Sequence, residues 1–364
     1  THSLTAPSGG TPGILSSTSV EAGGSSSRFS SAVASATLSW DEVGIIDISA
    51  TLEDYLGATA VDISGIASNV GRFYPARFDV SANSGSFSGA CDTFSYIGQD
   101  FGYETVPSLT ITAKNVVGAT TQNYTDSHFM KLVSGDISRV FPLNDINEPG
   151  AEGSNLMDLS TNPLLGALSA SGIAGVMTYL FDANDRYRYV QNSNALIAPF
   201  ESELSIVTND FQDVDGVTAT SIPPITPTGT WVRYGRWNMS NAFGPETAHL
   251  EMPGQVEYLT DTGYELNAID TCSVLSSSIL STNPAGSPGS GGINNIAVGG
   301  GESNFSCDSL LEGGDGSFSF SMPGAGYTGS IDLRLDLSSQ SWLRHDWDTD
   351  GDFEDHPDVT ASFG

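Results

Sequence analysis

Short runs in which apolar and polar residues alternate constrain the fold more than any other feature of this sequence. They occur at residues 36–40, 46–52, 109–113 and 331–337. Because successive side chains of a β-strand point to opposite faces, each run predicts a strand with one face in a core. Helical periodicity is scarce, and residues 156–168 are the one stretch that predicts a short helix. The pattern therefore predicts an all-β protein with little helix.

The length and the turn-forming segments predict how these strands are divided. A chain of 364 residues is long enough for two or three domains, each with its own core. Prolines in residues 222–229 favour extended geometry and cannot donate to a ladder, which predicts a linker. We expect tandem β-sandwich modules, immunoglobulin-like or jelly-roll-like. The predicted modules are 1–70, immunoglobulin-like with a Ser/Gly-rich start; 71–222, a β-sandwich; and 223–364, a β-sandwich with an acidic C-terminal loop.

The charge and composition of the chain limit its partners. It has 43 acidic residues against 12 basic ones, a net charge of −31, so nucleic acid and anionic lipid are expected to be repelled and cations attracted. Abundant Gly, Ser and Thr with very little Lys favour an extracellular protein. No apolar run reaches the ~18 residues of a membrane-spanning helix, so we expect no membrane insertion of this stretch. Any signal peptide is expected to be removed or to lie outside this sequence.

Three cysteines, Cys91, Cys272 and Cys307, leave room for one internal disulfide. Cys272 and Cys307 bracket a Gly/Ser-rich segment, and closing a loop of this size stabilises a fold by roughly 3–4 kcal/mol in the chain-entropy model. We therefore predict a Cys272–Cys307 bond, with Cys91 unpaired or paired outside this sequence. The chain contains no C-x-x-C motif, which disfavours a zinc ribbon or a redox site.

The acidic segment at residues 342–358 is the best candidate for a binding site. Asp346, Asp348 and Asp350 occupy alternate positions before a glycine, a spacing that lets a short loop surround calcium with carboxylate oxygens. An EF-hand carries a glutamate at its twelfth position, which is Pro357 when counted from Asp346, so an ordinary EF-hand is excluded. The predicted calcium ligands are Asp346, Asp348 and Asp350, the backbone of Asp352, and either Asp355 or Asp358 from the loop exit.

Two other interpretations of this segment remain open. The carboxylates could form a hydrated acidic turn without an ion, in which case mutual repulsion would raise the pKa of some of them. His345 and His356 flank the loop and could recruit a transition metal, although an oxygen-rich ligand set favours calcium over zinc.

Other motifs give weaker support for chemistry. The G-x-S-x-G sequence of serine hydrolases is absent, and no catalytic residue is predicted. The paired carboxylates of a glycoside hydrolase remain an alternative in so acidic a chain. Trp231, Tyr234, Trp237 and Tyr258 alternate with polar residues in predicted strands. This alternation favours core positions, but the rings could stack on sugars if they were exposed.

Several stretches, in chain order over residues 36–364, form a recognisable set. They are SWDEVG at 39–44, VGRFYP at 70–75, FSYIGQ at 94–99, TITAKN at 110–115, TTQNY at 120–124, RYGR at 233–236, NAFGPE at 241–246, and the acidic tail at 342–355. Together they resemble the C-terminal, DUF6701-like region of MshQ-like proteins. These proteins belong to the mannose-sensitive haemagglutinin (MSHA) type IV pilus system of marine and enteric Gammaproteobacteria.

The resemblance implies a non-enzymatic, extracellular protein of the bacterial cell surface, with a structural or adhesive role in type IV pilus biogenesis or attachment. Its implied partners are pilus subunits or other surface proteins, with surface glycans as a further option. The acidic loop adds an expectation of calcium stabilisation. Two alternatives stay open: a calcium-dependent carbohydrate-binding module and a polysaccharide-degrading enzyme.

Overall fold

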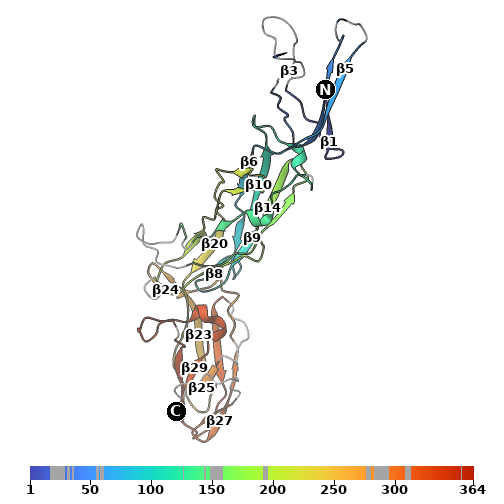
Figure 1. Cartoon of the computed structure of the whole chain (residues 1–364). Coiled ribbons are helices and arrows are strands. Elements are labelled where there is room, and N and C mark those ends of the chain that lie inside the picture. The colour runs from blue at the N-terminus through green and yellow to red at the C-terminus, as the bar shows by residue number, and fades with distance from the viewer. Residues whose placement is uncertain are drawn as a thin grey trace.

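A computed structural model of the chain shows an elongated molecule built almost wholly of β-strands (Figure 1). Three groups of sheets follow one another along its length, and the two termini lie in the first and the last group. No helix in the part of the chain that the structure describes is long and apolar enough to cross a membrane. The described residues are 1–16, 29–30, 33–34, 37–54, 57, 61–125, 127–142, 145–147, 159–191, 196–275, 280–282, 295–307, 313–353 and 355–364.

The first group is a three-stranded antiparallel sheet in the order β1-β4-β5. Leu15, Trp40 and Ile46 are buried in its small core. The strands of this group are β1 (His2–Ala6), β4 (Gly44–Leu52) and β5 (Ile63–Phe73), with a separate pair formed by β2 (Phe29–Ser30) and β3 (Val33–Ala34).

The second group contains two larger sheets whose side chains share one hydrophobic core. The six-stranded sheet is β13 (Ala167–Ala170), β14 (Val176–Leu180), β10 (Ser108–Lys114), β6 (Arg77–Asn83), β19 (Thr218–Ala219) and β18 (Phe211–Gln212). The five-stranded sheet is β16 (Phe200–Glu203), β20 (Thr228–Arg233), β7 (Ser86–Ser88) and β9 (Gly102–Thr105), with β8 (Phe94–Tyr96) paired to β20. Smaller elements are the pairs β11 (Arg139–Val140) with β17 (Val207–Thr208) and β12 (Leu159–Asn162) with β15 (Arg186–Tyr189), and the 3-10 helices η2 (Gln122–Thr125) and η3 (Ser134–Asp136).

The third group is a pair of sheets around a separate core. The six-stranded sheet is β21 (Gly235–Met239), β23 (Leu250–Thr260), β28 (Asp315–Phe320), β27 (Gly301–Cys307) and β26 (Asn295–Val298), with β24 (Gly263–Leu266) paired to β23. The four-stranded sheet is β22 (Ala242–Gly244), β30 (Asp358–Phe363), β29 (Gly329–Leu335) and β25 (Leu280–Thr282), and the 3-10 helix η5 covers Ser338–Leu343.

The second and third groups are packed against each other through β8. This strand pairs with β20 of the second group, yet Phe94 and Tyr96 are fully buried in the core of the third group. Gly235 permits the approach, because a Cβ at that position would lie 2.4 Å from the Tyr96 ring. The junction is therefore a continuation of the C-terminal core.

The all-β fold predicted from alternation is confirmed. Leu109, Ile111 and Ala113 on β10 are all fully buried, and the residues between them are not. The helix predicted over residues 156–168 is wrong: β12 and β13 occupy its described part. Pro163 explains the difference, since a proline disfavours helical geometry in the residue before it. The exact module bounds, 1–70, 71–222 and 223–364, stay predictions.

Truncating the buried face of β10 should destabilise the protein more than truncating its exposed face. We expect Ile111→Ala to lower the free energy of unfolding by about 2–5 kcal/mol, because it leaves a cavity in a closed core. Thr110→Ala, on the exposed face of the same strand, should change it by less than about 0.5 kcal/mol. Urea denaturation followed by circular dichroism measures both. Equal effects of the two variants would contradict the burial of this face.

Candidate functional site

The acidic loop, defined here as residues 344–357, connects η5 to β30 and brings three carboxylates together. One oxygen from each of Asp346, Asp348 and Asp355 lies within 4.8 Å of the others. Asp348 is exposed and the other two are half-buried. Calcium binds oxygens at about 2.3–2.6 Å, so oxygens this close can share one ion. The exposed acidic triad could therefore hold a cation.

Backbone N–H groups close the loop around the carboxylates. Asp355 accepts hydrogen bonds from the N–H groups of Trp347 (2.8 Å) and Asp348 (3.1 Å). Asp346 accepts them from Asp350 and Gly351, each at 3.1 Å. The entry and the exit of the loop are thus tied together by the side chains that form the triad.

The charges of the triad act on one another. The Asp350 N–H group lowers the pKa of the Asp348 carboxyl, but desolvation and the repulsion from Asp350, Asp355 and Asp346 outweigh it, and the pKa of Asp348 is raised overall. Repulsion of this kind disfavours the ionised form of a carboxyl group. A bound divalent cation would reverse it by adding positive charge between the oxygens.

The other three predicted ligands lie elsewhere. Asp358 forms a bidentate ion pair with Arg334, with both contacts at 2.7 Å, because β29 and β30 place these residues opposite each other. Asp350 and Asp352 are exposed, and the Asp350 side chain accepts the N–H of Asp352 at 3.1 Å. Within the described part of the chain, the structure brings together Asp346, Asp348 and Asp355 and leaves Asp350, Asp352 and Asp358 outside that group.

Aromatic and basic side chains pack the acidic loop against the third group of sheets. The His345 ring packs edge-on against Tyr264 and Trp347, with centroids 5.3 Å and 4.9 Å away. The Arg236 guanidinium lies 3.6 Å from the Tyr264 ring centroid and forms a 2.7 Å ion pair with Glu257. Burial, reinforced by Arg236, lowers the pKa of His345. These contacts were not predicted from the sequence, because Arg236, Glu257 and Tyr264 lie on β21, β23 and β24, far from the loop in the chain.

The disulfide of the structure joins Cys91 to Cys272, with Cα atoms 5.3 Å apart, a normal separation for such a bond. The predicted Cys272–Cys307 bond is therefore wrong. Cys307 lies on β27 in the ladder opposite Phe318, whereas packing of β8 into the C-terminal core brings Cys91 beside Cys272. The bond spans 181 residues and connects the second group of sheets to the third.

Buried polar groups reinforce this junction. The Tyr96 hydroxyl donates to Asp270 and accepts from the Asn267 side-chain amide, both at 2.5 Å. Asp270 also accepts the N–H groups of Cys272 (2.9 Å) and Ser273 (2.8 Å). Burial and the neighbouring Asp270 raise the pKa of Tyr96 far above its ordinary value. The tyrosine therefore stays a neutral hydrogen-bond donor.

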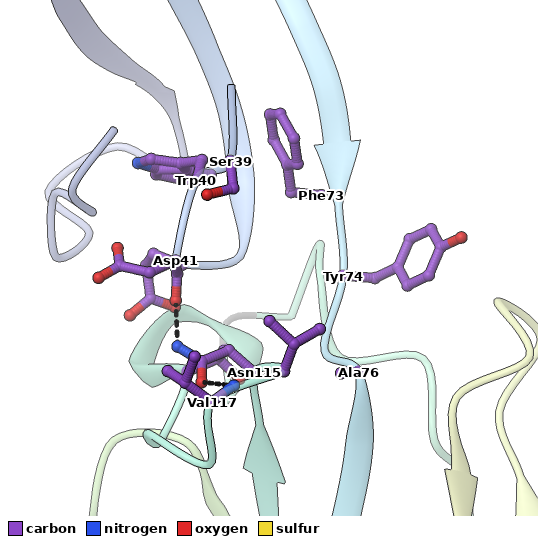
Figure 2. A pocket seen from close by; sticks show the side chains of 11 residues that line it. Ser39, Trp40, Asp41, Phe73, Tyr74, Ala76, Asn115 and Val117 are labelled. Atoms are coloured by element: carbon purple, nitrogen blue, oxygen red, sulfur yellow. Dashed lines mark hydrogen bonds between the residues drawn. The ribbon is translucent and has the colours of Figure 1, made fainter. Parts of the chain in front are cut away.

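A small pocket of about 150 Å³ lies between the first and second groups (Figure 2). Trp40 and Phe73 line it on one side and Val117 on the other, and the Asn115 side-chain amide donates a 3.0 Å hydrogen bond to the Asp41 carbonyl across its base. This bond ties the loop after β10 to the segment that precedes β4. The pocket was not anticipated from the sequence.

These features define a chain of β-sheet domains with a covalent junction and an acidic surface loop. Comparison with family models shows the family: residues 42–230 match the third domain of DUF6701 and residues 233–364 match its fourth domain. The chain therefore belongs to the DUF6701 family. No curated protein sequence matches it. The disulfide thus crosses the boundary between the two family domains.

Among solved structures, a surface layer protein, SbsC domains 4–9, shows a distant likeness. It is 12% identical, the aligned part covers 84% of this chain and 34% of that structure, and the TM-score is 0.17. The chain thus spans about a third of the length of that structure.

Peptide mapping tests the disulfide directly. In the non-reduced protein we expect one linked pair of peptides containing Cys91 and Cys272. The Cys91→Ser, Cys272→Ser double variant should lose about 2–5 kcal/mol of stability, because the bond closes a very long loop. Cys307→Ser is the matched control and should keep both the link and most of the stability. A Cys272–Cys307 peptide would contradict the structure.

Proposed function

We propose that this chain is a non-enzymatic, extracellular part of an MshQ-like protein that serves the MSHA type IV pilus system on a bacterial surface. Its role there is structural or adhesive. Membership of the DUF6701 family and the sequence segments that resemble MshQ-like proteins support this proposal. The observation that carries it is the construction of the chain: consecutive β domains packed end to end and joined covalently.

This construction suits a protein that must hold its shape outside the cell. Domains joined by a free linker move relative to one another unless a large apolar interface prevents it. Here Phe94 and Tyr96 extend the C-terminal core across the junction, and the Cys91–Cys272 disulfide links the two domains covalently. A disulfide persists in oxidising, extracellular surroundings. The proposed partners are pilus subunits or other surface proteins, which would meet a stiff, elongated surface.

We assign the acidic loop a calcium-stabilised structural role. Asp346 and Asp355 use their oxygens to hold backbone N–H groups, which is a structural task and not that of a general acid or base. Calcium prefers several carboxylate oxygens in a flexible arrangement. An ion at the triad would relieve the repulsion around Asp348 and stiffen the chain that leads into β30.

Calcium should raise the melting temperature of the protein. If calcium is present at ~100 times its Kd, a single site adds about 2.7 kcal/mol, which corresponds to a rise of roughly 5–10 °C for a domain of this size. Differential scanning calorimetry in chelator and in millimolar calcium measures the shift.

Matched variants locate the effect. Asp348→Asn should remove most of the calcium-dependent rise, because it takes away one negative charge and replaces one of the two carboxylate oxygens by an NH₂ group that cannot bind calcium. Asp261→Asn makes the same charge change at an exposed position in the turn between β23 and β24, and should leave the rise intact. Identical melting in chelator and calcium would count against the calcium role.

A genetic experiment tests the pilus role. In the bacterium that carries this gene, residues 42–364 are deleted in frame, and surface pili and attached cells are counted. We expect fewer pili or weaker attachment, restored by the complete gene but not by a copy that carries the Cys91→Ser, Cys272→Ser pair. Normal pili and normal attachment after the deletion would overturn the proposal.

A further inference from the structure

An open groove of about 460 Å³ lies at the junction of the two family domains. Thr93 and Pro199 from the third domain line it together with Tyr258 and Ile269 from the fourth domain. Trp231 and Arg233, at the end of β20, complete the lining. None of the described residues of the acidic loop belongs to the lining.

β20 presents an aromatic ring to this groove. Thr230 and Val232 on one face of the strand are buried, whereas Trp231 on the other face is 48% exposed. Of the four aromatic residues predicted from the sequence to be core residues, two are in a core and two are not. Tyr234 and Trp237 are fully buried, but Trp231 and Tyr258 line the groove.

Arg233 is a fixed donor beside the indole. Its guanidinium lies 4.4 Å from the Tyr258 ring centroid and 4.9 Å from that of Phe94, and it donates to the side-chain oxygen of Asn267. Asn267 in turn belongs to the buried network around Tyr96. Among the described residues, no carboxylate lies within 4.0 Å of this guanidinium. Arg233 therefore forms no ion pair with any described carboxylate.

The opposite strand adds an acceptor. Glu201 on β16 is exposed and directly opposite Trp231, and residues directly opposite in an antiparallel pair share a face of the sheet. The aromatic surface and the guanidinium that line the groove thus have a carboxylate beside them, although Glu201 is not itself a lining residue. Such a combination suits a ligand with one apolar face and hydroxyl groups around its edge.

We propose that this groove binds a neutral pyranose ring of a glycan. The C–H face of the ring would stack on Trp231, and its hydroxyl groups would hydrogen-bond to Arg233 and Glu201. The net charge of −31 and the Glu201 carboxylate beside the indole oppose polyanionic glycans and nucleic acid. The inference does not depend on the pilus role or on calcium, since the acidic loop is not part of the groove.

The junction pre-organises the groove. Cys91 and Cys272, whose bond connects the two domains, lie two residues from Thr93 and three from Ile269 in the chain. Walls that come from different domains keep their spacing only while the domains are held together. Binding to a pre-organised site loses less conformational freedom and is tighter. Breaking this disulfide should therefore weaken binding of the sugar.

Isothermal titration calorimetry of the complete chain tests the proposal. The probes are maltotriose, lactose and mannotriose, titrated in chelator. We expect saturable binding of at least one of them, weakened roughly 2- to 13-fold in Trp231→Ala, because stacking on an aromatic ring is worth about 0.5–1.5 kcal/mol. Trp231→Phe, which keeps a smaller ring, should lose less affinity.

Trp347→Ala is the matched control, since Trp347 is also exposed (40%) but lies in the acidic loop. It should bind as the unaltered protein does, and circular dichroism confirms that each variant is folded. Any of four results would overturn the proposal: no saturable response to the three sugars, the same affinity in Trp231→Ala, loss of binding in chelator, or tighter binding of polygalacturonate or a polyproline peptide than of the neutral sugars.

Discussion

The insertion of β8 into the core of the C-terminal sheets is the constraint on which the rest of the structure depends. Its backbone pairs with β20, while Phe94 and Tyr96 are buried among residues of the next domain. Apolar burial of this kind is the main favourable term in folding. It also places Cys91 beside Cys272 and the Tyr96 hydroxyl beside Asp270. One short strand thus determines how two domains meet.

Nearby hydrogen bonds and ion pairs compensate several carboxylates of this strongly negative chain. Asp346 and Asp355 accept backbone N–H groups, and the Asp358 side chain pairs with Arg334. Charge-assisted hydrogen bonds of this kind are stronger than neutral ones. The raised pKa of Asp348 marks the place where this compensation is incomplete, because other carboxylates surround it. That is where a cation would have the largest effect on the loop.

The junction and the groove are two consequences of the same packing. Because β20 carries β8 on its edge, the outer face of β20 ends at the boundary between the domains, with Trp231 and Arg233 on it. Tyr258 reaches the same place from β23 and contacts the guanidinium. Neither domain alone supplies both the indole and the phenol. A surface that needs both exists only while the disulfide and the shared core hold the domains in place.

The sequence by itself determined the strands and part of the candidate site. Alternation at residues 109–113 is a local property and predicts which side chains face a core. The acidic loop was likewise identified locally, and three of its predicted ligands, Asp346, Asp348 and Asp355, do converge. Only the tertiary structure decided that Cys91 meets Cys272, 181 residues away, that Asp358 pairs with Arg334, and that Trp231 stays exposed. Local periodicity tells which face of a strand is apolar. What covers that face depends on long-range packing, which no local pattern encodes.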